Sequence, residues 1–172
     1  MGEQVRGRRW EAPQAGWIKL NTDAALDQKS NKAGWGVVAR NSLGELVGAW
    51  ARPIDGCAEA QVEEALAIRE AVVIAKRMGW RKVVLESDCK IVVDKINARE
   101  EAVSIATIQW DIWRLMKDFD KCCCSFTRRS NNYVSHYLAK FAITLIDVAE
   151  WKLSFLAWLL ELAQADVQEQ LL

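Results

Sequence analysis

The feature that most constrains the fold is a change of hydrophobic period after the first third of the chain. Residues 17–25 alternate apolar or small side chains with polar ones, the period of two that a β-strand requires. Two more β-type runs, at 33–41 and 46–54, flank a short glycine-containing turn and predict a hairpin. Residues 58–78 then lack Gly and Pro and carry an apolar stripe that ends at Gly79. Three antiparallel strands are therefore expected before a long helix.

The remaining chain alternates strand and helix. The apolar run within residues 81–88 is typical of a central strand that helices cover on both faces. Further elements are expected as helices at 89–97 and 105–119, a fifth strand at 122–128, a helix from Asn132 onward, and a tail helix at 148–165. The order β-β-β-α-β-α-α-β-α, followed by the tail helix, predicts an α/β fold.

Composition indicates one globular domain. The chain has 172 residues, 51% of them apolar, and no repeat or polar low-complexity stretch divides it. We therefore expect an N-terminal extension at 1–16, a core domain at 17–146 and a C-terminal helical extension at 147–172. The longest nearly apolar segment, Leu153 to Leu160, is far shorter than the roughly 20 residues of a membrane-spanning helix.

The expected location is intracellular, either cytoplasmic or nuclear. The first residues lack the apolar core of a secretory signal. The five cysteines include the triplet Cys122, Cys123 and Cys124, which we interpret as buried thiols of a strand. The 23 basic residues balance 23 acidic ones, so a polyanionic partner would have to be held by local clusters or by metal ions.

Three acidic residues lie near the middle of the predicted sheet: Asp23 late in the first strand, Glu64 in the long helix and Asp88 after the central strand. Clustered carboxylates are the ligands that Mg²⁺ prefers, which suggests phosphoryl chemistry. Each residue also has a structural interpretation. Asp23 continues the polar face of its strand, and Asp88 is placed to cap the following helix. Glu64 lies on a small-apolar helical face, but periodicity separates it only weakly from Glu63.

Several ordered strings carry a family resemblance: WIKLNTDAAL, AGWGVVARNSLGELV, EEALAIREAVVIAKRMGW, RKVVLESDCKIVVDKIN and RRSNNYVSHYLAK. Together they resemble the ribonuclease H type 1 domain, in particular the plant branch found in retrotransposon-derived reverse transcriptase-like proteins. The resemblance covers roughly Trp10 to Ile143. It implies the ribonuclease H-like fold, a mixed five-stranded sheet with helices on both faces.

The resemblance also implies an active site. The family's first three carboxylates fall on Asp23 in N-T-D-A, Glu64 in E-A-L-A and Asp88 in E-S-D, whereas His136 stands at the position of the fourth. It implies Mg²⁺-dependent hydrolysis of the RNA strand of an RNA–DNA hybrid. With His136 as a fourth ligand, Mn²⁺ is an alternative ion. His136 is otherwise a proton carrier or a structural residue in the first turn of its helix.

Substrate contacts are expected beside this site. Arg128, Arg129 and Asn132 are candidate nucleic-acid-binding residues, although the favoured interpretation of Asn132 is a helix N-cap. Other basic residues are expected to be solvated surface charges or backbone contacts: Lys19, Lys29, Lys32 and Arg40.

Two alternatives remain open at this point. The first is a catalytically weak or silent nucleic-acid-binding module of retroelement origin, which the His136 departure favours. The second is a structural or protein-interaction domain that uses its Trp-rich tail helix and binds no nucleic acid. The apolar side of that helix either docks on the domain or mediates a homodimer or a protein partner.

Overall fold

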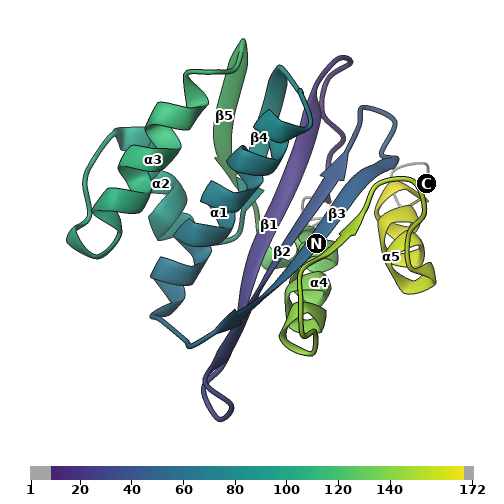
Figure 1. Cartoon of the computed structure of the whole chain (residues 1–172). Coiled ribbons are helices and arrows are strands. Elements are labelled where there is room, and N and C mark those ends of the chain that lie inside the picture. The colour runs from purple at the N-terminus through teal and green to yellow at the C-terminus, as the bar shows by residue number, and fades with distance from the viewer. Residues whose placement is uncertain (1–8, 169–172) are drawn as a thin grey trace, which may run out of the picture.

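The strands form one mixed sheet in the order β5-β4-β1-β2-β3-β6 in the computed structural model, which describes residues 9–168 (Figure 1). Strands β1, β2 and β3 pair antiparallel, and β4 and β5 continue the sheet parallel to β1. The strand bounds are Ile18–Asp27 (β1), Lys32–Arg40 (β2), Leu46–Asp55 (β3), Lys82–Ser87 (β4), Lys121–Phe126 (β5) and Ala149–Trp151 (β6). The mixed sheet confirms the expected fold class.

Helices cover both faces of the sheet (Figure 1). Their bounds are Ala60–Arg77 (α1), Lys90–Ala98 (α2), Ala106–Met116 (α3), Tyr133–Ile143 (α4) and Ala157–Gln168 (α5), with short 3-10 turns at Val103–Ile105 and Arg129–Asn131. One core packs α1, α2 and α3 against Leu20 and Val37, and a second packs α4 and α5 against Val38 and Ala49. The alternation of neighbouring strand residues between these cores is the period of two expected from the sequence.

Two glycines of β2 set how closely α4 approaches the sheet. A Cβ atom at Gly36 would lie 2.6 Å from the Ser135 carbonyl oxygen, and one at Gly34 would meet the Ala139 carbonyl oxygen. The absence of a side chain at both positions therefore lets the α4 backbone lie directly on β2. This contact fixes α4 beside β1, where the candidate site lies.

The tail differs from the expected single helix at 148–165. Residues Ala149–Trp151 instead form β6, which pairs with the edge strand β3 and makes the sheet six-stranded rather than five-stranded. Strand β3 would otherwise present unpaired backbone groups, which explains why a short strand is favoured here. Only then does α5 begin, and Leu159 and Trp158 pack into the second core. The tail therefore docks on its own domain.

Two further expectations need adjustment. Among the three adjacent thiols only Cys124 is buried, whereas Cys122 is half-buried and Cys123 is exposed, because β5 is an edge strand of the sheet. The expectation of buried thiols is therefore wrong for Cys123. Parts of the two expected extensions, residues 1–8 and 169–172, lie outside the described residues. Within the described part of the chain, no helix is long and apolar enough to cross a membrane.

Candidate functional site

The sheet register brings two of the predicted carboxylates to the same level. Parallel pairing of β1 with β4 runs from Ile18↔Val83 to Thr22↔Ser87, so Asp23 and Asp88 are the next residues of their chains. Glu64 reaches the same place from the first turns of α1, on the face that packs against the sheet. One carboxylate oxygen from each of the three residues lies within 4.8 Å of the other two. We call Asp23, Glu64 and Asp88 the acidic cluster.

The acidic cluster is short of compensating charge, with two buried members and a half-buried Asp88. Asp23 has no exposed surface, and Glu64 is 9% exposed. Burial raises the pKa of Glu64 well above its ordinary value, and the nearby Asp23 carboxylate raises it further. The pKa of Asp88 is also raised, by burial and by Asp23, against the opposing effect of the Arg129 guanidinium. Full ionisation of the three carboxyl groups is therefore unfavourable without a bound cation.

Two carboxylate oxygens of the acidic cluster lack a partner. No donor within residues 9–168 reaches Asp23 Oδ1 or Glu64 Oε2, although both are buried. The other oxygen of Glu64 accepts only a long hydrogen bond, 3.4 Å, from the backbone N–H of Ala24. Buried anionic oxygens without donors are costly. Hard carboxylate oxygens at this spacing fit a divalent cation such as Mg²⁺ or Mn²⁺, which would supply the missing positive charge.

His136 adjoins the acidic cluster from α4. Its Nδ1 lies 2.7 Å from Asp23 Oδ2, and its side chain is 17% exposed. The residue lies in the first turn of α4, beside the central strand. The contact joins the fourth predicted residue to the first, and it engages the Asp23 oxygen that is not orphaned.

Asn132 fastens α4 to β1 rather than reaching outward. It occupies the N-cap position, but its side chain makes no capping hydrogen bond. Its amide nitrogen donates to the Thr22 carbonyl oxygen at 2.9 Å, and its amide oxygen accepts from Asn21 and Ser135. Asn132 is 1% exposed. Asn132 is therefore the N-cap residue that the sequence predicted, but its polar side-chain atoms bond inside the protein. A phosphate contact by Asn132 stays a prediction.

The two predicted arginines remain at the surface, and one of them lies beside the acidic cluster. Arg128 and Arg129 are exposed, and Arg129 Nε lies 3.5 Å from Asp88 Oδ2. The alternative interpretation of Asp88 as a helix cap is wrong, since Cys89 is the N-cap residue of α2 and no side chain caps it. Asp88 is therefore free to join the other two carboxylates.

The neighbouring glutamate Glu63 has a different environment. Its Oε2 accepts from the Trp35 indole at 2.7 Å, and its Oε1 accepts from the backbone N–H of Ala58 at 3.2 Å. Glu63 is thus buried with both oxygens bonded, whereas Glu64 points to the acidic cluster. Glu63 therefore has a structural role, whereas the adjacent Glu64 is a candidate metal ligand.

Two basic residues that were expected at the surface are buried. Lys19, 8% exposed, lies 3.1 Å from Glu86 and donates to the Glu11 carbonyl oxygen. Arg40, 1% exposed, lies 2.7 Å from Asp166 of α5. Both expectations as surface charges are therefore wrong, because alternation along the strand gives the face of a side chain but not what covers that face.

A pair of exposed tyrosines was missed. Tyr133 and Tyr137 stack with ring centroids 6.1 Å apart, and the Tyr137 ring is 5.8 Å from the His136 ring. Their spacing of four residues in a predicted helix was the available signal.

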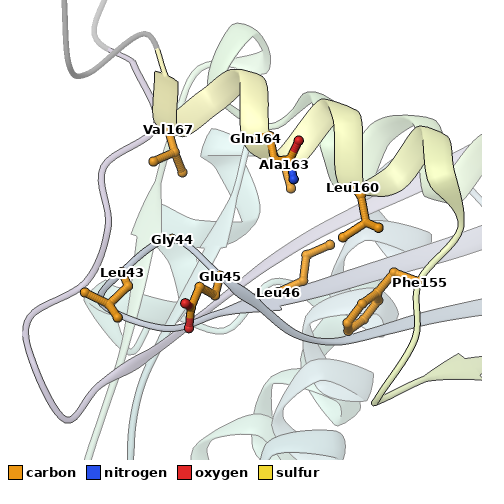
Figure 2. Close-up of a pocket in the computed structure, with 9 residues that line it drawn as sticks. All are labelled: Leu43, Gly44, Glu45, Leu46, Phe155, Leu160, Ala163, Gln164 and Val167. Carbon is orange, nitrogen blue, oxygen red and sulfur yellow. The ribbon is translucent and has the colours of Figure 1, made fainter.

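An apolar cavity of about 520 Å³ lies elsewhere, between the β2–β3 turn and α5 (Figure 2). Leu46, Phe155 and Leu160 point into it from the two sides. The acidic cluster and His136 do not line this cavity.

Comparison with known proteins agrees with this architecture. The N-terminal RNase H domain of a Mycobacterium tuberculosis protein matches with a TM-score of 0.67 and 18% identity, over 74% of this chain and 93% of that one. RNase H1 from Halobacterium salinarum matches with a TM-score of 0.68 and 20% identity, over 74% and 97%. LC11-RNase H1, solved in complex with an RNA/DNA hybrid, gives 0.66 and 19%, over 73% and 96%. The chain therefore has the ribonuclease H-like fold.

The family is set by a sequence model. Residues 21–142, more than half of the chain, match the model of the reverse transcriptase-like family, and the protein belongs to that family. A search of curated proteins finds no match.

Proposed function

We propose that this protein is a divalent-metal-dependent endonuclease that hydrolyses the RNA strand of RNA–DNA hybrids. The observation that carries the proposal is the acidic cluster, whose buried carboxylate oxygens converge and include two without a donor. A structural ion-pair network would pair such oxygens with cationic side chains, as this protein does elsewhere. A metal site leaves them open for the cation.

Asp23, Glu64 and Asp88 would hold the metal through their carboxylate oxygens. When bound there, a divalent ion would lower the pKa of a coordinated water and neutralise charge on the scissile phosphate. His136 orients the Asp23 carboxylate through the 2.7 Å contact of Nδ1 with Oδ2. Its position at the mouth of the site also suits proton transfer to a leaving oxygen. Mn²⁺ is the alternative ion, because imidazole is a softer ligand than carboxylate.

The proposed substrate follows from the fold relatives and from the local charge. One of these relatives, LC11-RNase H1, was solved with an RNA/DNA hybrid. Arg128 and Arg129 are exposed cations, Arg129 lies beside Asp88, and both would contact backbone phosphates. Discrimination of RNA from DNA requires contacts to the 2′-hydroxyl.

The family match supports a retroelement-related origin, and we assign the chain to the plant branch on the strings quoted above. All five thiols are free, which supports a reducing, intracellular location in cytoplasm or nucleus. We retain 17–146 as the nuclease domain, with the N-terminal segment and the β6–α5 tail as appended elements.

A second candidate function is a silent hybrid-binding module. The specific observation in its favour is His136, which replaces a carboxylate and already engages one oxygen of Asp23. Such a module would bind a hybrid without cutting it.

Cleavage of a 5′-labelled RNA–DNA hybrid separates these functions. The proposal predicts RNA cuts with 5′-phosphate and 3′-hydroxyl ends in Mg²⁺ or Mn²⁺ and none in EDTA. Asp88→Asn should lose cleavage, while Asp94→Asn, a matched change at an exposed residue of α2, should retain it. Binding without cleavage in either metal would support the silent module, and cleavage that survives Asp88→Asn would contradict the proposed site.

A further inference from the structure

The segment around α4 has an unusual charge. Residues 127–146 contain no Asp or Glu, although the chain as a whole carries equal numbers of acidic and basic residues. The segment contributes three cations, Arg128, Arg129 and Lys140, and all three are exposed. Arg129 lies 3.5 Å from Asp88, but the segment itself adds only positive charge. A local excess of cations attracts a polyanion at short range even when the net charge of the protein is zero.

The same segment exposes two aromatic rings. Tyr133 and Tyr137 are 45% and 46% exposed, one helical turn apart on α4. Their rings lie at an interplanar angle of 23°, so they form a stacked pair. Lys140 follows at the next position of the same helical face. We call Tyr133, Tyr137 and Lys140 the α4 face.

The α4 face is continuous with the candidate active site. His136 lies between the two tyrosines in sequence, and its ring contacts that of Tyr137 edge-on at 5.8 Å. His136 also contacts the acidic cluster, because its Nδ1 lies 2.7 Å from Asp23 Oδ2. A strand that leaves the acidic cluster along α4 would therefore meet the tyrosine pair first.

The chemistry of the α4 face favours a single strand as its occupant. Aromatic side chains bind unpaired nucleotides by stacking on their bases, and nearby cations track the phosphates. Paired bases inside a duplex offer no free face to a tyrosine ring. A second copy of this neutral chain offers no comparable match to the stacked tyrosines and the cations of residues 127–146.

We propose that the α4 face binds the single-stranded nucleotides that flank a hybrid, by stacking an unpaired base on the Tyr133–Tyr137 pair. This inference rests on the proposed function, because it places the flanking strand relative to a hybrid at the acidic cluster. It assigns the enzyme a preferred substrate, a hybrid with a single-stranded extension rather than a blunt one.

The test uses the full chain and two hybrids that differ only in a short single-stranded extension carrying 2-aminopurine. Binding is measured in EDTA by fluorescence anisotropy, and stacking by quenching of the 2-aminopurine. The wild type should bind the extended hybrid about tenfold more tightly than the blunt one, the size expected for one stacked base. Extensions of RNA and of DNA on either strand identify which flank is bound.

The Tyr133→Leu/Tyr137→Leu variant keeps an apolar surface but removes the rings, and it should lose both the tenfold preference and the quenching. Trp110→Leu is the matched control, since Trp110 is an exposed aromatic residue of α3 on the other face of the sheet. That control should behave like the wild type. A circular-dichroism melt of each variant confirms that it is folded.

The outcomes separate the two proposals. Equal affinity for both hybrids, or quenching that survives in the double variant, would overturn the role of the α4 face while leaving the nuclease proposal intact. Tyrosine-dependent quenching without cleavage in Mg²⁺ or Mn²⁺ would support the α4 face as part of a silent binding module and would overturn the nuclease.

Discussion

Strand β1 carries two buried polar clusters that differ in how completely they are bonded. Toward its start, Asn21 donates to Glu86 and Asn132 and accepts from the Trp10 indole, while Lys19 pairs with Glu86 at 3.1 Å. Two residues further on, Asp23 belongs to the acidic cluster, where two oxygens have no donor. Both clusters are buried on the same strand, yet only the first is internally satisfied.

The difference indicates that the two buried polar clusters have different roles, one structural and one as a candidate metal site. The first cluster, which we call the bonded cluster, consists of Lys19, Asn21, Glu86, Asn132 and Trp10 and joins β1 to β4, α4 and the N-terminal segment. It holds the elements that present the acidic cluster. The acidic cluster is left incomplete by the protein, and a cation would complete it.

The largest expected effect is on catalysis. Glu64→Gln should lower metal-dependent cleavage of a hybrid by about a thousandfold, which corresponds to about 4 kcal/mol of activation free energy. The reason is loss of one charged metal ligand. The neighbouring change Glu63→Gln is the matched control and should alter cleavage far less, because Glu63 bonds to Trp35 and Ala58 instead. Similar losses for both variants would break the distinction between the two glutamates.

A change in the bonded cluster should mainly affect stability. Glu86→Leu leaves the Lys19 ammonium buried without its carboxylate, and we expect the free energy of unfolding to fall by about 3 kcal/mol. Urea denaturation measures it. The double variant Lys19→Met/Glu86→Leu should recover part of the loss, since it removes both charges. No recovery would indicate that the ion pair is not the main contribution of these residues.

A substitution in the acidic cluster should stabilise the metal-free protein, whereas a substitution in the bonded cluster destabilises it. In EDTA, Glu64→Gln should raise the free energy of unfolding by about 1 kcal/mol, because the amide removes a carboxyl group whose ionisation is opposed by burial and by Asp23. Thermal denaturation with and without Mg²⁺ measures this effect. The variant should also lose the stabilisation that Mg²⁺ gives to the wild type. A less stable metal-free variant would mean that the Glu64 carboxylate is compensated by contacts within the protein.

Without metal, the contribution of Glu64 and Asp88 to the free energy of unfolding should fall as the pH rises. The pKa values of Glu64 and Asp88 are raised in the folded protein, so the folded state retains protons that the unfolded chain releases. Their contribution is therefore fully present below the unfolded pKa values, about 4, and is lost as pH rises through the folded ones. The difference in unfolding free energy between wild type and Glu64→Gln should widen over this range in EDTA. A constant difference would contradict the raised pKa of Glu64.

The smallest expected effect concerns metal preference. His136→Asp restores a fourth carboxylate beside Asp23, and the ratio of cleavage rates in Mg²⁺ and Mn²⁺ should shift toward Mg²⁺ by about threefold, because Mg²⁺ favours oxygen ligands. Initial rates in each metal measure the ratio. An unchanged ratio would indicate that residue 136 does not influence the metal ligands.

Local sequence patterns predicted most of the fold. The apolar stripe in the segment without Gly or Pro predicted α1, and the alternation of apolar and polar residues predicted β1. Both patterns are repeated over many residues. The short strand β6 was missed because three residues carry too little periodicity and its pairing depends on β3, about a hundred residues earlier. Tertiary pairing, rather than local propensity, makes this strand.

The candidate site was only partly accessible from the sequence. The resemblance selected Glu64 over Glu63, which periodicity alone could not do. The burial of Lys19 and the internal bonding of Asn132 were missed because each depends on partners far away in the chain. Contacts of this kind follow from how sheet and helix are stacked, which no local pattern records.

The most direct test of the account is calorimetric titration of the wild type and of Asp23→Asn with Mg²⁺ and with Mn²⁺. The account predicts saturable binding to the wild type, loss of that binding in Asp23→Asn, and wild-type binding in Glu63→Gln. Equal binding by wild type and Asp23→Asn, or no binding to the folded wild type, would contradict the claim that the acidic cluster is a metal site.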